Sequence, residues 1–322
     1  MTDTSEISVR VARKTVEALD ISSFELVRTD GQPLPAFSAG SHVDVHLPSG
    51  TTRQYSLCND AAESHRYLIG VLRDPASRGG SRAMHDEVNE GDVLRISTPK
   101  NHFELAHGAT HSILLAGGIG VTPILCMAER LAAIGSAFEM HYCTRSPERT
   151  AFRQRIADAA FAPQVQFHFD DAAAEQKLSI ERVLGEVRPG THLYVCGPKG
   201  FMDWVLGGAR AAGWPEAQLH YEFFAADVSP SADDSSFDVK LASSGRVIRI
   251  PADRTVVQAL GDAGVDVQVS CEQGVCGTCL TRVLEGEPDH KDLYLTPEEQ
   301  AANDQFTPCC SRSRSPMLVL DL

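Results

Sequence analysis

The sequence predicts a multidomain protein with an antiparallel β-barrel, a doubly wound α/β domain and a small α+β domain of the β-grasp type. Three observations predict it. Short alternating strands fill the first third of the chain, strands then alternate with helices, and five of the nine cysteines lie within residues 271–310. Such changes of pattern mark domain boundaries. The expected segments are 1–105 (barrel), 106–225 (α/β domain), 226–236 (linker) and 237–322 (last domain).

The first segment has the pattern of an all-β domain. The stretches ISVRV and HVDVHL alternate apolar and polar residues, as half-buried strands do. The stretches TDGQPLP, PSG and NEGD supply turn residues between the strands. Short strands at this spacing predict a barrel or a sandwich.

The second segment changes to an alternation of strands and helices. HSILLAGG is an unbroken apolar run, typical of a strand that is covered on both faces. TPILCMAERLAAIG then has helical periodicity, and the alternation continues to the helix expected at GFMDWVLGGARAAG. This order predicts a parallel, doubly wound sheet.

The third segment follows AADVSPSADDSS, whose Ala, Ser, Asp and Pro content is typical of a linker. Two strands and a helix are expected before the cysteines. The net charge of −14 argues against nucleic acid and anionic membranes as partners. We find no apolar run of membrane-spanning length and no signal peptide, so the expected location is the cytoplasm.

The cysteine cluster has the spacing of a plant-type [2Fe–2S] site. Cys271, Cys276 and Cys279 are separated by four and then two residues, and Cys309 follows after 29 more. Glycines 274 and 277 would let the loop wrap a cluster and aim backbone N–H groups at its sulfides.

Two alternatives to this ligand set stay open. A structural zinc site would use two C-x2-C turns, whereas the chain has one, so zinc fits the spacing less well. Cys310 directly follows Cys309 and could replace it as the fourth ligand. The 29-residue gap favours Cys309, with Cys310 as a buried neighbour.

Two turns are candidates for binding a dinucleotide. LLAGGIGVTPI is a strand, a glycine-rich turn and a helix start, where free N–H groups could face a pyrophosphate. Glycine-rich turns of this kind also arise for packing. YVCGPKGFM ends a second strand of the same sheet, where ligands bind beyond the strand ends. The candidate residues are Gly117, Gly118, Gly120, Pro123 and Cys196.

The β domain holds candidates for a flavin site. In RQYSLCN, Arg53 could bind a phosphate and Tyr55 could stack on a flat ring, with Ser56 on the opposite face of the strand. The alternative is an ordinary strand with an exposed arginine and a core tyrosine. A candidate phosphate cradle in SRGGSRAMH consists of Gly79, Gly80 and Ser81.

Taken in order, these stretches resemble the phthalate dioxygenase reductase and vanillate O-demethylase oxidoreductase family of the ferredoxin–NADP reductase superfamily. The resemblance rests on RQYSLCN, SRGGS, GGIGVTP, CGP, YEFF and the terminal cysteines, and it covers essentially the whole chain. It implies an FMN barrel, an NAD domain and a ferredoxin domain, in that order.

The resemblance also implies roles for single residues. Arg53, Tyr55 and Ser56 would hold FMN, with Gly80 and Ser81 near its phosphate. Phe224 would lie near the flavin ring, and the four cysteines would bind the cluster. The nicotinamide would be placed by Gly118, Thr122, Cys196, Gly197 and Pro198.

FMN rather than FAD follows from the resemblance, and NADH is expected rather than NADPH. In TRSPERTAF, Arg145 or Arg149 could meet a 2′-phosphate, while Glu148 would oppose one. One departure from the family is Cys310, where many relatives have valine.

The implied function is the reductase component of an aromatic oxygenase or demethylase, which passes electrons from NADH through FMN and the cluster to a Rieske-type non-haem iron oxygenase. A monomer is expected. Alternatives are a reductase for a haem or carnitine-type monooxygenase, a redox-sensing module, or a zinc-stabilised binding protein. The acidic ferredoxin segment suggests a basic docking patch on the partner, although this acidity could serve solubility alone.

Overall fold

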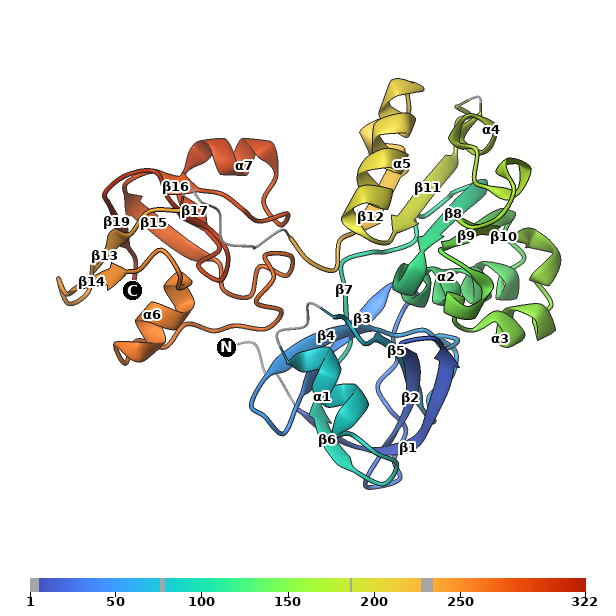
Figure 1. Ribbon diagram of the computed structural model, residues 1–322, viewed down its shortest axis with the longest axis horizontal. Coiled ribbons are helices and arrows are strands. Elements are labelled where there is room, and N and C mark those ends of the chain that lie inside the picture. The colour runs from blue at the N-terminus through green and yellow to red at the C-terminus, as the bar shows by residue number, and fades with distance from the viewer. Residues whose placement is uncertain (1–5, 76–78, 186, 227–233) are drawn as a thin grey trace. The chain divides into compact units, whose positions relative to one another are not determined.

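The computed structural model describes residues 6–75, 79–185, 187–226 and 234–322 (Figure 1). The chain falls into two compact units, Met1–Glu222 and Phe223–Leu322. Most of the predicted linker lies outside the described residues, as do Ser77 and Arg78 of the predicted phosphate cradle stretch. In the part of the chain that the structure describes, no helix is both long and apolar enough to cross a membrane.

A seven-stranded antiparallel sheet forms the first part of the first unit. Its order is β4-β3-β6-β1-β2-β5, and β7 pairs with β3. A bridge between Leu57, just after β4, and Ile69 of β5 links the two ends of this order. The short helix α1 (Gly80–Asp86) lies between β5 and β6 in the chain. The strands are β1 (Ile7–Ala18), β2 (Ile21–Arg28), β3 (Ser41–His46), β4 (Thr52–Ser56), β5 (Tyr67–Leu72), β6 (Val93–Ile96) and β7 (Lys100–Asn101).

The predicted alternation explains which face of this sheet is buried. In β1, Ile7, Val9 and Val11 are buried, while Ser8 and Arg10 are exposed. The buried residues join one apolar core with side chains from β2, β3, β5 and β6. Burying apolar surface stabilises a fold by about 25 cal/mol per Å², so this core is the main contribution to the stability of the sheet.

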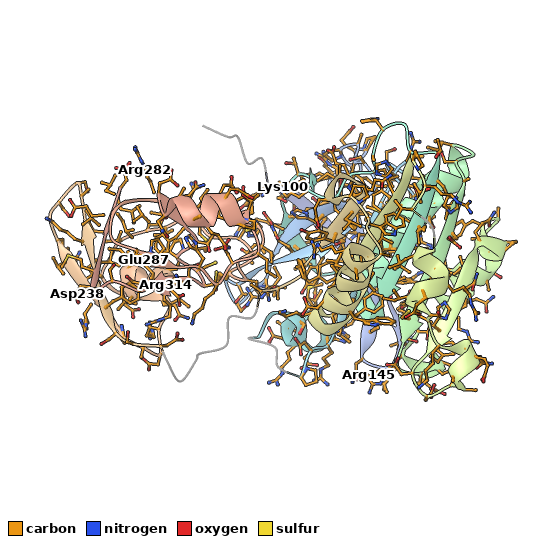
Figure 2. The ribbon with its side chains drawn as sticks, turned by 90° about the horizontal axis from the view of Figure 1, so that it is seen from above. Lys100, Arg145, Asp238, Arg282, Glu287 and Arg314 are labelled. Atoms are coloured by element: carbon orange, nitrogen blue, oxygen red, sulfur yellow. The ribbon has the colours of Figure 1, made fainter. Side chains whose placement is uncertain are left out.

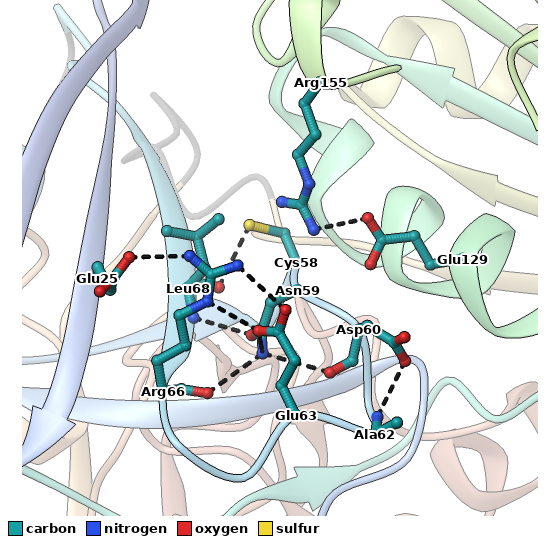
Figure 3. Close-up of polar contacts among 10 residues, drawn as sticks. All are labelled: Glu25, Cys58, Asn59, Asp60, Ala62, Glu63, Arg66, Leu68, Glu129 and Arg155. Atoms are coloured by element: carbon teal, nitrogen blue, oxygen red, sulfur yellow. Dashed lines mark hydrogen bonds and ion pairs between the residues drawn. The ribbon is translucent and has the colours of Figure 1, made fainter. Parts of the chain in front are cut away.

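A polar network fixes the loop between β4 and β5 (Figure 3). The fully buried Asn59 donates from its amide to Glu63 at 3.1 Å, and its Oδ1 accepts from the backbone N–H of Leu68 at 2.9 Å. Arg66 pairs with Glu63 at 2.8 Å and with Glu25 at 2.9 Å. The network therefore holds the chain directly after β4, a strand with predicted site residues.

The second part of the first unit is a parallel sheet of five strands, in the order β10-β9-β8-β11-β12. The order reverses between β8 and β11, which makes their carboxyl ends the expected ligand site. Its strands are β8 (His111–Gly117), β9 (Phe138–Thr144), β10 (Val165–Phe169), β11 (Thr191–Cys196) and β12 (Leu219–Glu222). Its helices are α2 (Val121–Ala133), α3 (Arg153–Asp158), α4 (Ile180–Leu184) and α5 (Lys199–Ala211), and its 3-10 turns are η1 (Gly118–Gly120), η2 (Pro147–Arg149), η3 (Ala162–Gln164), η4 (Ala174–Gln176) and η5 (Glu216–Gln218).

The two parts of the first unit contact each other directly. Arg155 of α3 pairs with Glu129 of α2 at 2.6 Å, beside the Cys58 thiol of the β4–β5 loop (Figure 3). Arg149 pairs with Asp20 across the same junction at 3.2 Å. Side chains from both parts can therefore contribute to one site.

The second unit contains a mixed sheet in the order β14-β13-β19-β15-β17 and a two-stranded sheet of β16 and β18. Capping boxes begin the two helices found among its described residues, at Thr255 with Gln258 and at Thr296 with Glu299. On its surface, Arg314 lies 3.5 Å from Glu287 (Figure 2). The elements are β13 (Phe237–Leu241), β14 (Val247–Ile250), α6 (Val256–Asp262), β15 (Thr281–Glu285), β16 (Pro288–Asp289), α7 (Pro297–Ala302), β17 (Gln305–Phe306), β18 (Arg312–Ser313) and β19 (Met317–Leu320).

Candidate functional site

The loop between α6 and β15 brings the four predicted thiols together as two pairs. The thiols of Cys271 and Cys276 are hydrogen-bonded to each other, and so are those of Cys279 and Cys309. Over the described ranges, no three His, Cys, Asp or Glu side chains converge as they would around a single metal ion. A [2Fe–2S] cluster has two irons and four cysteine ligands, so two pairs of thiols fit it.

Within each pair the two thiols have opposite pKa shifts: the pKa values of Cys271 and Cys309 are raised, and those of Cys276 and Cys279 are lowered. The backbone N–H of Gln273 donates to the Cys271 sulfur at 3.3 Å. The hydrogen bond with Cys271 lowers the pKa of Cys276 to about 5. The hydrogen bond with Cys309 lowers the pKa of Cys279. One sulfur of each pair is therefore stabilised in the thiolate form, which is the form that iron binds.

Cys310 has a different environment from the paired cysteines. Its sulfur lies 3.1 Å from the Thr307 hydroxyl. Gly274 packs directly on it: a Cβ at Gly274 would come within 2.6 Å of the Cys310 sulfur, and the φ of +69° also favours glycine. Because Cys309, and not Cys310, pairs with Cys279, the arrangement favours Cys309 as the fourth ligand.

Strand β4 carries the predicted flavin residues. Arg53 and Tyr55 share one face, and Ser56 lies on the other. The Tyr55 hydroxyl is buried without a hydrogen-bond partner among the described residues, and burial raises the pKa of this phenol. The Arg53 side chain lies against the backbone of Gly80, and Ser81 accepts a hydrogen bond from the backbone N–H of Asp74 at 3.2 Å. An unpartnered hydroxyl beside a guanidinium fits a polar, phosphorylated cofactor.

The two predicted nucleotide turns contact each other at the carboxyl ends of β8 and β11. A Cβ at Gly120 would lie 2.3 Å from the carbonyl oxygen of Cys196, so only glycine allows this approach. The buried Thr122 donates to the carbonyl of Ile119 at 3.1 Å and so closes the turn. The remaining predicted residues of the two turns are Gly117, Gly118, Pro123, Gly197 and Pro198.

A third group of side chains meets where these turns face β4. Cys196 and Glu222 are register partners at the ends of β11 and β12. The Ser56 hydroxyl donates to Glu222 at 3.5 Å. Desolvation raises the pKa of Glu222 to about 7, and burial, with the nearby Glu222 carboxylate, raises that of the fully buried Cys196. The site therefore combines a hydroxyl, a thiol and a carboxyl that titrates near neutrality.

Sequence reasoning assigned no role to Glu222, although it lies in the YEFF stretch that carries the family resemblance. Its position at the carboxyl end of the last strand of a parallel sheet was the available signal. The sequence could not show that Ser56, 166 positions earlier, lies beside it.

Comparison with known proteins covers the whole chain. It is 57% identical over 317 residues to the vanillate O-demethylase oxidoreductase of Pseudomonas putida, an alignment that spans 98% of this chain and 100% of that protein. The chain belongs to the vanillate O-demethylase oxidoreductase and phthalate dioxygenase reductase family. The solved structure of phthalate dioxygenase reductase, described as modular for electron transfer from pyridine nucleotides to [2Fe–2S], matches with a TM-score of 0.82 and 40% identity, over 99% of this chain and 98% of that one.

Models of smaller families match two parts of this oxidoreductase. Residues 239–314 match the 2Fe-2S iron-sulfur cluster binding domain. Residues 96–219 match the N-terminal domain of dimethylamine monooxygenase subunit DmmA-like proteins. A type IV self-sufficient cytochrome P450 monooxygenase also matches, with a TM-score of 0.79 and 38% identity over 98% of this chain and 41% of that one.

Membership in the oxidoreductase family confirms the predicted fold class, with a flavin domain, an α/β nucleotide domain and a ferredoxin domain. It also confirms the predicted enzyme class and the predicted cofactors FMN, NADH and a [2Fe–2S] cluster. The roles of single residues stay predictions. Phe224 is partly buried and belongs to the second unit. Its position near the flavin ring also stays a prediction.

Proposed function

We propose that this chain is the reductase component of a multicomponent aromatic oxygenase or demethylase system whose partner is a Rieske-type non-haem iron oxygenase. The observation that carries the proposal is the full-length similarity to a vanillate O-demethylase oxidoreductase, at 57% identity. The two thiol pairs and the Ser56, Cys196 and Glu222 group support it, since the chain then has both an electron entrance and an exit.

The proposed cofactor sites are those predicted from the sequence. Arg53, Tyr55 and Ser56 bind FMN, with Gly80 and Ser81 at its phosphate and Phe224 near its ring. Gly117, Gly118, Gly120, Thr122, Pro123, Cys196, Gly197 and Pro198 bind NADH, and Cys271, Cys276, Cys279 and Cys309 bind the cluster. The proposed domains are 1–105, 106–225 and 237–322, with a linker at 226–236.

A flavin, when bound, accepts a hydride as an electron pair and releases electrons singly, as an iron–sulfur cluster requires. The protein has to hold the nicotinamide and the flavin in contact and keep water out. Buried Cys196 and Thr122 line the nicotinamide side in this proposal. The Ser56 hydroxyl orients the flavin edge, and Glu222 holds a proton or a charge beside it according to pH.

The proposed partner follows from the charge of the ferredoxin segment as well as from the relatives. From Asp234 to Leu322 the chain has 8 Lys/Arg and 14 Asp/Glu, a net charge of −6. An acidic surface favours a partner with a basic docking patch. A monomeric state and a cytoplasmic location complete the proposal.

A haem monooxygenase is a second candidate acceptor. The similarity to a self-sufficient cytochrome P450 supports it, because that protein includes a region resembling this whole chain. The two candidates differ in the acceptor alone, and both use the same path inside the chain.

The decisive experiment combines the purified chain with candidate oxygenases under air. With a Rieske-type vanillate demethylase we expect NADH oxidation that depends on the aromatic substrate, and one product per NADH. Anaerobic titration with NADH should bleach both flavin and cluster absorbance. If NADH is oxidised only with a haem protein, the acceptor is haem, and if neither chromophore is present, the proposed function is wrong.

A further inference from the structure

His42 of β3 is a buried histidine whose hydrogen-bonding groups are unmet. The residue is 5% exposed, and neither of its ring nitrogens has a hydrogen-bond partner among the described residues. Burial lowers its pKa to about 4, so at pH 7 the ring is neutral and has one N–H donor and one acceptor nitrogen. Buried polar groups in proteins nearly always have a partner, because an unmet group keeps the full cost of leaving water. We therefore expect a bound molecule to supply a partner for His42.

The polar neighbours of His42 on its own face of the sheet bond to one another instead. Asp44, two residues further along β3, accepts from the Lys100 ammonium at 2.8 Å and from the Gln54 amide at 2.9 Å. The ring centroids of His42 and His102 are 5.6 Å apart, with an interplanar angle of 35°. This is a packing contact between rings, and it leaves both nitrogens of His42 unmet.

The pairing of β3 with β4 places His42 beside the predicted flavin residues. His42 is the register partner of Ser56, and directly opposite residues of an antiparallel pair share a face, with Cβ atoms about 4.5–5.5 Å apart. The Ser56 hydroxyl donates to Glu222 at 3.5 Å. In the next pair of the ladder, the buried hydroxyl of Tyr55 also has no partner among the described residues. Two neighbouring pairs of this ladder thus each present an unmet polar group.

We propose that a ring nitrogen of His42 hydrogen-bonds a polar edge atom of bound FMN and so helps to hold the flavin ring in place. The isoalloxazine has carbonyl, nitrogen and N–H groups at its edge, and these suit a side chain with one donor and one acceptor. His42 is then a cofactor-binding residue beside Ser56, which orients the flavin edge in the proposed function. The inference rests on that flavin site. A water molecule at His42 is the competing explanation, and the test separates the two.

The test measures the dissociation constant of FMN by titrating the full-length chain, stripped of flavin, and following the FMN fluorescence. In His42→Leu we expect this constant to rise roughly three- to tenfold, as the loss of one hydrogen bond implies. The melting temperature of the flavin-free protein should not fall, because leucine removes a buried polar group that has no partner there. A histidine with a purely structural role would give the opposite result, lower stability with unchanged FMN binding.

Three further His42 variants and one control sharpen the result. His42→Phe keeps a flat ring without nitrogens, so it should weaken FMN binding as leucine does, and it carries the test if the leucine variant does not fold. His42→Asn and His42→Gln each keep a donor and an acceptor, and at least one of them should bind FMN more tightly than the two apolar variants. His102→Leu changes the exposed neighbouring ring and should bind FMN as the wild type does.

Two results would overturn the proposal. One is a wild-type dissociation constant for FMN in the folded apolar variants, which would leave water as the partner of His42. The other is a lower melting temperature of the flavin-free protein, or failure to fold, in both apolar variants, which would make the role of His42 structural. A wild-type chain that binds no FMN would instead refute the proposed function, so the two failures are distinguishable.

Discussion

The two candidate sites of this chain are built in opposite ways. Three of the four cluster cysteines lie within nine residues of one loop, and Cys309 follows the short strand β17. The junction of Ser56, Cys196 and Glu222 instead takes one side chain from each of three strands in two domains. The first site depends on spacing along the chain, and the second on packing between domains. Variants of the two sites should therefore have different effects. A variant of a cluster cysteine should lose the cluster completely, whereas a variant of the junction should slow the reaction without abolishing it.

The largest expected effect is at the cluster. In Cys279→Ser we expect loss of the iron and of cytochrome c reduction, because one thiol pair is broken. Reduction of the flavin by NADH should persist, because every residue proposed to bind these two cofactors except Phe224 lies in the first unit. Iron analysis and stopped-flow absorbance measure both results. Cys143→Ser is the matched control, and retention of two irons in Cys279→Ser would contradict the ligand assignment.

The next effect is at the junction. In Glu222→Gln we expect flavin reduction by NADH to slow by roughly tenfold or more, as loss of an oriented charged group implies. The wild-type rate should change with an apparent pKa near 7, and the variant should lack this inflection. The same substitution at the exposed Glu216, which pairs with Arg210, is the control and should change neither rate nor pH profile.

The same carboxyl should make stability depend on pH. The pKa of Glu222 is raised from its ordinary value of 4.5 to about 7, so the folded state holds a proton that the unfolded state releases. Its contribution to stability is complete below pH 4.5 and is lost as the pH rises through 7. The loss is on the order of 3 kcal/mol at most. We therefore expect a higher melting temperature for Glu222→Gln than for wild type at pH 8, and no such gain at pH 4.5.

A smaller effect concerns the contact between the two nucleotide turns. Gly120→Ala would push a Cβ against the carbonyl of Cys196, and overpacking of this kind costs about 1–3 kcal/mol. We expect a lower melting temperature and a higher KM for NADH. Gly200→Ala is the matched control, because nothing lies within 4 Å of a Cβ there and alanine favours the helix. Equal melting temperatures of the two variants would refute the tight contact.

The smallest effect concerns the choice of nucleotide. Arg145 is exposed directly after β9 (Figure 2), whereas Arg149 pairs with Asp20. In Arg145→Ala we expect kcat/KM for NADPH to fall roughly threefold, as for an exposed ion pair, and that for NADH to stay within error. In Arg149→Ala the change in kcat/KM should differ less between NADPH and NADH than it does in Arg145→Ala. Equal losses with NADH and NADPH would show that Arg145 does not meet a 2′-phosphate.

The comparison also shows how far sequence reasoning reached. The alternation in ISVRV gave the buried face of β1, and the order of strands and helices gave the parallel sheet. The cysteine spacing indicated a four-thiol site because the ligands are local. Glu222 was missed because its importance depends on a neighbour in another domain. Gly120 was predicted from its glycine-rich turn, but the structure alone shows that the carbonyl of Cys196 requires glycine there.

The sequence by itself determined the three-part architecture and the set of thiols, because periodicity and short spacings act within a few residues of chain. Only the tertiary structure decided which thiols pair, which way Cys310 faces and which carboxyl lies against Ser56. Those outcomes depend on burial and on distances between remote segments. Desolvation and hydrogen bonding act on atoms that are close in space, wherever they lie along the chain.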